Sequence, residues 1–143
     1  MSVYQDIISF GDHTSVATIV TDSRRRIEFV NDAFTLLCGH EKHEVLGKSP
    51  AEILQGPETS EESKFEIRKA LQYPRPFTAK ILNYHKDLHT YITGLYVLPF
   101  QDDTTESDYF LALERELSSW DEGLLDCPRF AKGLADVMSI LLD

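Results

Sequence analysis

The stretch GKSPAEILQGPET at residues 47–59, followed by LNYHKD at residues 82–87, decides the fold of this chain. Ser49 is a good N-cap, Pro50 suits the first helical position, and Glu52 can reach back to the cap. A short helix is therefore expected to begin here, with a Gly-Pro turn after it. The second segment ends an apolar strand at a polar turn.

Hydrophobic periodicity and turn residues predict an α+β chain around these two segments. A short leading helix or cap is expected at residues 3–10, ended by Gly11 and Asp12, and a capping box of Thr59 with Glu62 is expected to begin a helix that runs to about Leu71. The remaining expected elements are a hairpin of strands at residues 15–21 and 27–30, a helix at 33–38 stopped by Gly39, and strands at 77–84, 89–98 and 109–116.

The chain changes character after residue 116. Residues 119–122, Ser-Trp-Asp-Glu, form another capping signature, and Pro128 can open a last helix. One face of that helix would carry an apolar stripe of Phe130, Leu134, Val137, Met138 and Leu141. The stripe can pack on the sheet of its own domain or contact a second copy of the chain, and periodicity does not separate these alternatives.

Composition is that of one compact domain. The chain has 143 residues, of which 42% are hydrophobic, and this suffices for a single core of ordinary size. The net charge of −10 disfavours nucleic acid as a partner, and the basic run at residues 24–26 is expected to be a solvated hairpin tip. There is no bilayer-spanning run or secretory leader pattern, and the two cysteines are far apart, so a cytoplasmic protein without a disulfide framework is expected.

The two motifs, together with TDSRRRIEFVNDAF at residues 21–34 and DYFLALE at residues 108–114, resemble the light-oxygen-voltage (LOV) branch of the PAS sensor superfamily. The resemblance implies a PAS fold, which is a five-stranded antiparallel sheet with helices on one face and flanking helices at both ends of the chain. It divides the chain into an N-terminal cap segment (1–14), a LOV-like PAS domain (15–116) and a C-terminal helical extension (117–143).

One departure from the family pattern concerns the photochemistry. In LOV domains the third residue after the motif's opening glycine is the cysteine that bonds to a photoexcited flavin. Here that position is Pro50, and residues 51–54 are one residue longer than the family pattern. The resemblance therefore implies a LOV-type domain without cysteinyl-flavin photochemistry.

The resemblance also implies a ligand pocket that can bind FMN noncovalently. Arg68 matches one of two phosphate-binding arginines, while Ala51 and Glu52 stand around the place of the other, where a carboxylate would oppose an anion unless it points away. The implied cofactor-binding residues are Thr21, Asn31, Gln55, Arg68, Asn83, Thr93 and Glu114, with Ile19 beside them. Thr93 and Glu114 replace an asparagine and a glutamine of the family.

Each retained polar residue also has a purely structural interpretation. Gln55 can bond the backbone of its turn, and Asn83 can cap the turn after its strand. Arg68 can pair with the glutamates of its own helix. Taken together in family order, these residues favour an ancestral ligand pocket.

Two hypotheses of function follow, and neither is an enzyme, since no nucleophile-base pair or Gly-rich phosphate loop is present. The first is a sensory module that binds a flavin or another planar molecule noncovalently. The alternative is a ligand-free module for dimerisation or protein interaction, whose pocket is filled by Phe29, Tyr91 and Phe110. Both act through a homodimer or a partner signalling protein, contacted by the sheet and the terminal helices.

The remaining candidates for chemistry are weak. Two histidine pairs, His40 with His43 and His85 with His89, have spacings that can join two ligands, but a closed metal site needs three or four. They are expected to be surface residues, and no metal site is predicted. Cys38 is expected to be a buried small apolar residue.

Overall fold

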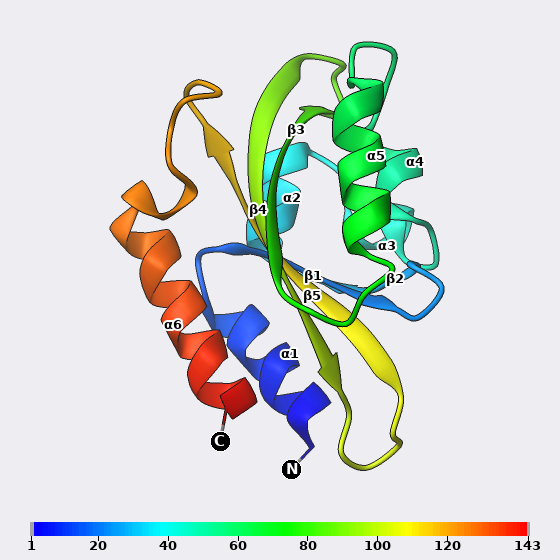
Figure 1. Ribbon diagram of the computed structural model, residues 1–143, viewed down its shortest axis with the longest axis vertical. Coiled ribbons are helices and arrows are strands. Elements are labelled where there is room, and N and C mark those ends of the chain that lie inside the picture. The colour runs from blue at the N-terminus through cyan, green and yellow to red at the C-terminus, as the bar shows by residue number, and fades with distance from the viewer. Residues whose placement is uncertain (1, 143) are drawn as a thin grey trace.

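The computed structural model describes residues 2–142 and arranges them as a sheet between two layers of helices (Figure 1). The strands are β1 (Ala17–Asp22), β2 (Ile27–Val30), β3 (Phe77–Tyr84), β4 (Thr90–Gln101) and β5 (Asp108–Leu117). The helices are α1 (Val3–His13), α2 (Asp32–Cys38), α3 (Lys42–Val45), α4 (Pro50–Leu54), α5 (Glu61–Ala70), a 3-10 turn η1 (Leu124–Asp126) and α6 (Pro128–Leu142).

The sheet has five strands in the order β2-β1-β5-β4-β3, and every neighbouring pair is antiparallel. The last strand in sequence, β5, therefore lies at the centre of the sheet. Two strands, then helices, then three strands is the order that the sequence predicts, and the PAS fold is confirmed.

The two faces of the sheet have separate cores because side chains on a strand alternate between faces. Leu111 and Leu113 of β5 are fully buried on the face that α1 and α6 cover. Ala112 and Glu114 point to the opposite face, which α2 to α5 cover. In Figure 1, α1 and α6 lie side by side on one side of the sheet, with α5 on the other. The two terminal helices thus cover the face of the sheet opposite to α2–α5.

The leading helix is longer than the sequence predicts. Gly11 does not end it, because α1 continues to His13 and Thr14 donates its N–H to the carbonyl of Phe10. Gly11 serves close packing instead: a Cβ built there would lie 2.5 Å from the ring of Phe29. The absence of a side chain lets the helix touch β2.

Two predicted caps are wrong. Helix α5 is capped by Ser60, which accepts from Ser63 N, while the Thr59 hydroxyl donates to the carbonyl of Leu82 and so ties the Gly-Pro turn to β3. No helix begins at residues 119–122, because the Glu122 carboxylate accepts from Ser118 N–H and pairs with Arg115 at 3.0 Å. The last helix begins at Pro128, as predicted, and the capping box of Ser49 with Glu52 is confirmed.

The apolar stripe of α6 packs on its own chain. Phe130 and Val137 are almost completely buried in the core that α6 shares with α1 and the sheet, and Leu134, Met138 and Leu141 pack against it. Gly133 approaches Val16 so closely that a Cβ would lie 2.9 Å from its methyl group. Of the two alternatives left by periodicity, packing on the same domain is the one that the structure shows.

Asn31 joins three elements at the edge of the sheet. Its side-chain oxygen caps α2 by accepting from Phe34 N and also accepts from Thr18 N. Its amide group donates to the carbonyls of Gly11 and Val16, at 2.9 Å each. The side chain is buried, so water could not take over these four hydrogen bonds if the side chain were removed.

We therefore expect Asn31→Ala to lower the free energy of unfolding by about 3 kcal/mol, since it removes a cap and leaves buried partners unpaired. Urea denaturation measures this change. Ser60→Ala is the matched control: it removes only the cap of an exposed helix and is expected to cost about 1 kcal/mol. Equal losses in the two variants would contradict this role for Asn31.

Candidate ligand cavity

A cavity of about 350 Å³ lies between the sheet and helices α4 and α5. Strands β1, β3, β4 and β5 form its floor, and α5 covers it. Its apolar walls include Ile19, Leu54, Ile67, Ile81, Leu95 and Phe110. The volume falls within the range of pockets that hold small organic ligands, and a mostly apolar lining is typical of them.

The cavity has a buried carboxyl group in its floor. Glu114 is 6% exposed, and its Oε1 has no hydrogen-bond partner within the described chain. Glu114 lies between Ala17 on β1 and Leu95 on β4, so the sheet fixes its backbone on both sides. Burial raises the pKa of this carboxyl from about 4.5 to about 7. Near neutral pH, Glu114 can therefore donate a hydrogen bond as well as accept one.

An amide stands in the same floor. Asn83 of β3 lines the cavity and donates from its Nδ2 to the hydroxyl of Thr93 at 3.2 Å. Thr93 is fully buried behind it and does not line the cavity. Thr93 thus holds Asn83 in place, and the carbonyl oxygen of Asn83 stays available to a ligand.

Four cationic side chains line the exposed part of the cavity: Arg24, Arg25, Lys64 and Arg68. Arg24 and Arg25 lie in the β1–β2 hairpin turn, where the sequence predicts a solvated tip, and their side chains also line the cavity. Lys64 pairs with Glu61 at 3.2 Å, whereas Arg68 has no ion pair within residues 2–142. The charges favour an anionic group at this side of the cavity.

Helix α4 supplies another wall through Ser49, Pro50 and Ala51. Glu52 is not part of that wall, because its carboxylate turns back and accepts from Ser49 N–H at 2.8 Å. The carboxylate that would oppose an anion thus points away. Pro50, at the place of the family's cysteine, does line the cavity.

The structure brings most of the predicted site together. Thr21, Gln55, Arg68, Asn83 and Glu114 line the cavity, while Thr93 lies behind Asn83. Asn31 does not line it, because all its hydrogen-bonding groups are engaged with backbone.

The aromatic residues do not fill the cavity. Phe29 belongs to the core on the opposite face of the sheet, where it meets Gly11, and Phe110 forms one wall. Tyr91 packs beside Cys38 and Val45, in the core under α2. Cys38 is fully buried, as predicted, and burial raises the pKa of its thiol to about 11.

Comparison with known proteins supports the assignment of this chain as a PAS domain. Residues 15–119 match the PAS domain family. The chain is 31% identical over 122 residues to phototropin-2 of Oryza sativa subsp. japonica, covering 85% of this chain and 13% of that protein. It is 34% identical over 121 residues to a blue-light photoreceptor of Listeria monocytogenes, covering 73% of this chain and 47% of that protein. The chain thus spans less than half the length of these curated relatives.

Solved structures agree on the fold. The LOV protein of Rhodobacter sphaeroides superimposes with a TM-score of 0.82 at 21% identity, covering 97% of this chain and 81% of that one. A LOV-domain structure studied with a flavin analogue superimposes with a TM-score of 0.66 at 27% identity, covering 73% and 78%.

The chain belongs to the PAS domain family. Its similarity to LOV photoreceptors in both sequence and structure makes it a PAS domain of the LOV type. Such domains are sensory modules of signal transduction. Among the described residues no helix is long and apolar enough to cross a bilayer.

The buried carboxyl of Glu114 should make stability depend on pH. Its pKa is higher in the folded chain, about 7 against about 4.5, so the native state keeps a proton that the unfolded state releases. The free energy of unfolding should therefore fall as pH rises from about 4.5 to about 7, by on the order of 2 kcal/mol.

The measurement is chemical denaturation across that pH range, in which Glu114→Gln should remove this part of the slope. Glu66→Gln on the exposed surface of α5 gives the matched control for loss of one carboxyl. A slope that survives in the Glu114 variant would refute the assignment.

Proposed function

We propose that this protein is a sensory module whose cavity binds a planar heteroaromatic ligand with an anionic tail, and that the ligand is a flavin mononucleotide held noncovalently. The observation that carries the proposal is the polarity of the cavity. It has an unpartnered carboxyl oxygen on Glu114 in a largely apolar interior and cationic residues where it is exposed.

The residues present fit such a molecule. Asn83 and Glu114 would hold the polar edge of an isoalloxazine ring, and Gln55 would hold its ribityl chain. The phosphate would then lie at the cationic lining formed by Arg24, Arg25 and Arg68. When bound, the flavin supplies light absorption and electron transfer.

Glu114 gives this site a property that an amide would not have. An amide keeps its NH₂ donor group and its carbonyl acceptor at every pH, whereas a carboxyl with a pKa near 7 changes its hydrogen bonding when it gains or loses a proton. Glu114 could therefore take up or release a proton in response to a ligand held in the cavity. In this way the ligand state can alter the central strand of the sheet.

Binding of the phosphate is tested with two variants. Arg68→Gln should weaken the affinity for FMN by about tenfold and leave riboflavin, which has no phosphate, nearly unchanged, because only the charge-assisted contacts are lost. Fluorescence titration measures both affinities. Arg75→Gln is the control, since Arg75 lies over the ring of Tyr73 and does not line the cavity. Equal effects of Arg68→Gln on the affinities for FMN and riboflavin would contradict the assignment of Arg68 to the phosphate.

The photochemical consequence is tested at Pro50. Blue light should leave the absorption band of the FMN-loaded protein without a reversible loss, because no thiol lies at this position. Pro50→Cys should introduce a reversible loss of that band, since residue 50 lines the cavity. Absorption spectra before and after illumination make the comparison, with Pro50→Ser as the control. A reversible loss in the unsubstituted protein would contradict the proposal.

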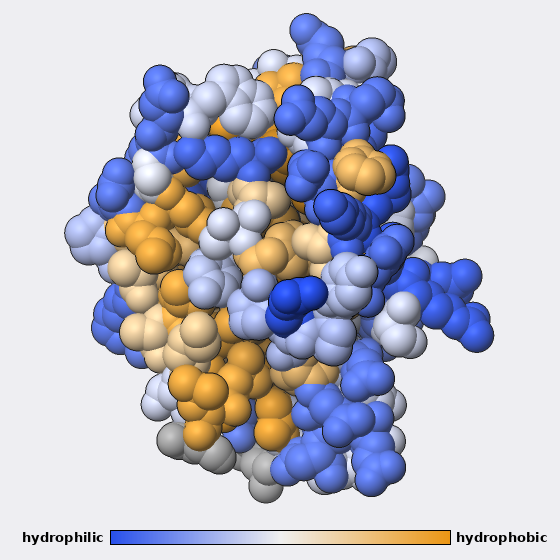
Figure 2. Space-filling model, in the orientation of Figure 1, coloured by the Kyte–Doolittle hydropathy of each residue, from blue (hydrophilic) through white to orange (hydrophobic). Residues whose placement is uncertain are grey.

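A second candidate function is protein interaction through the flanking helices, with a second copy or a signalling partner. Figure 2 shows apolar side chains gathered over the side of the molecule where α1 and α6 lie, and Trp120, Leu125 and Leu142 of the C-terminal part are exposed. If the protein neither carries nor takes up a flavin or another small molecule, this interaction is the function that remains.

A further inference from the structure

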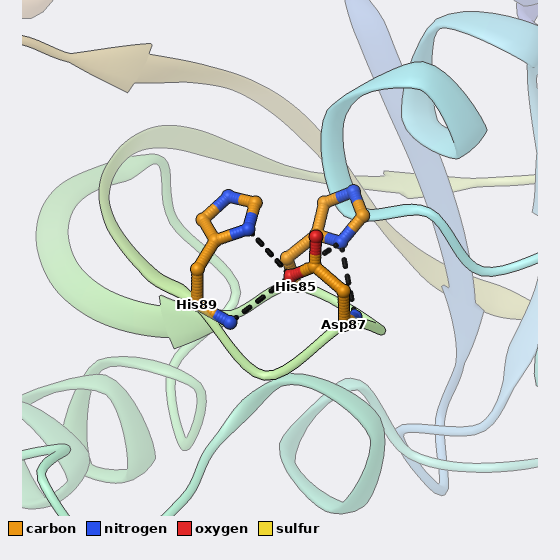
Figure 3. Close-up of side chains that lie close together, drawn as sticks. All are labelled: His85, Asp87 and His89. Atoms are coloured by element: carbon orange, nitrogen blue, oxygen red, sulfur yellow. Dashed lines mark hydrogen bonds and ion pairs between the residues drawn. The ribbon is translucent and has the colours of Figure 1, made fainter.

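The hairpin between β3 and β4 gathers two imidazoles and a carboxylate outside the cavity. His85, Asp87 and His89 each offer one ligand atom, and these atoms lie within 4.8 Å of one another. Figure 3 shows both imidazole rings on the same side of the hairpin, with the carboxylate between them. Spacing alone identifies two histidines across a turn; the structure adds the carboxylate as a third ligand.

The three side chains share one contact point. Oδ1 of Asp87 lies 3.2 Å from Nδ1 of His85 and 2.5 Å from Nδ1 of His89. The two rings are stacked, with their centroids 4.5 Å apart and an interplanar angle of 17°. Two nitrogens and one oxygen at these separations can surround one cation after small side-chain rotations, since Zn–N and Zn–O bonds are about 2.0–2.2 Å long.

The backbone fixes this arrangement. His85 N–H donates to the carbonyl of His89 at 2.8 Å, and His89 N–H donates to Oδ1 of Asp87 at 3.0 Å. The ring of His85 rests against the backbone at Gly39, where a Cβ would collide with it. Preorganised ligands lose little conformational freedom when they bind.

Contacts with the neighbouring helices also hold the hairpin in place. Lys86 N–H donates to the carbonyl of Cys38 at 2.8 Å. The Lys86 ammonium, the cation nearest in sequence to the cluster, is paired with Glu44 at 2.7 Å. Its charge is therefore partly compensated and opposes a bound cation less than a free lysine would.

We propose that His85, Asp87 and His89 form a binding site for a late first-row divalent metal ion, with Zn²⁺ as the representative. Imidazole nitrogen with carboxylate oxygen is a donor set that suits zinc, nickel and copper, whereas magnesium and calcium prefer oxygen alone. Three protein ligands leave a coordination position for water or for a side chain of another molecule. On metal binding, Asp87 would exchange its contacts to the two rings for a bond to the metal, and Nδ1 of His85 would give up the hydrogen bond that it accepts from Asp87 N–H at 3.1 Å.

The site adjoins the cavity through the chain. Asn83, in the cavity floor, precedes His85 by two residues, and its neighbour Tyr84 packs on Gly56 of the Gly-Pro turn. A metal that clamps the hairpin would restrain the ends of β3 and β4 beside that floor. The metal site does not depend on which ligand the cavity takes, so the two proposals fail separately.

Isothermal titration of the tag-free, EDTA-treated protein with Zn²⁺ tests the site. We expect saturable binding of one equivalent, which Mg²⁺ in excess does not displace. Asp87→Asn should weaken it about tenfold or more, although asparagine keeps the hydrogen bond of the turn. His89→Gln should weaken it similarly. The controls are His13→Gln and His43→Gln, which remove exposed histidines outside the cluster and should bind like the parent.

Two further readouts decide the outcome. Long-range ¹H–¹⁵N spectra should show shifts of the imidazole nitrogens of His85 and His89 on addition of Zn²⁺, and thermal unfolding in EDTA should show that the variants remain folded. Weak, unsaturated binding that all variants share would mean diffuse attraction to an acidic surface and would overturn the proposal. Undiminished affinity in Asp87→Asn would overturn the three-ligand site.

Discussion

The rest of the structure depends on one constraint, which is that successive side chains of the central strand β5 alternate between the two faces of the sheet. Leu111 and Leu113 fill the core under α1 and α6, and Ala112 and Glu114 form part of the floor of the cavity on the other face. A shift of one residue in the register with β1 or β4 would place a carboxyl in the core and two leucines in the cavity. The small side chain of Ala112 helps to leave space there.

The distribution of charge follows from the same architecture. The chain has a net charge of −10, yet four cations line the exposed part of the cavity. Of the acidic groups near them, Glu52 turns back to cap its own helix, and Glu61 pairs with Lys64 alone among the four. An anionic ligand that approaches a mostly acidic protein thus meets a local region of the opposite sign.

The sequence predicted the strands and the cap at Ser49 well, because alternation and capping are local signals. The prediction that α1 ends at Gly11 was wrong. This glycine permits contact with Phe29, and the local sequence pattern carries no signal of a ring that is distant in the chain. The family order predicted the cavity residues Gln55, Arg68 and Asn83. It also included Asn31, whose structural hydrogen bonds depend on partners as far away as Gly11.

The sequence pattern does not place the cationic lining, for a related reason. Arg24 and Arg25 lie in a turn, and a run of arginines in a polar turn is indistinguishable from a solvated tip until the turn is placed over the cavity. In the β3–β4 hairpin, spacing along the sequence pairs His85 with His89, and only the conformation of the turn brings the Asp87 carboxylate between them. Both arrangements depend on the orientation of turns, which propensity does not encode.

The helix start at Ser49 and Pro50 bears on how this protein can change over evolutionary time. Proline at the first helical position already has the dihedral angle that the helix needs, and Ser49 and Glu52 satisfy each other's backbone donors. Replacing Pro50 by cysteine would return conformational freedom to the unfolded chain, at a cost of roughly 0.4–1 kcal/mol. A thiol at this position would therefore weaken the helix start that carries it.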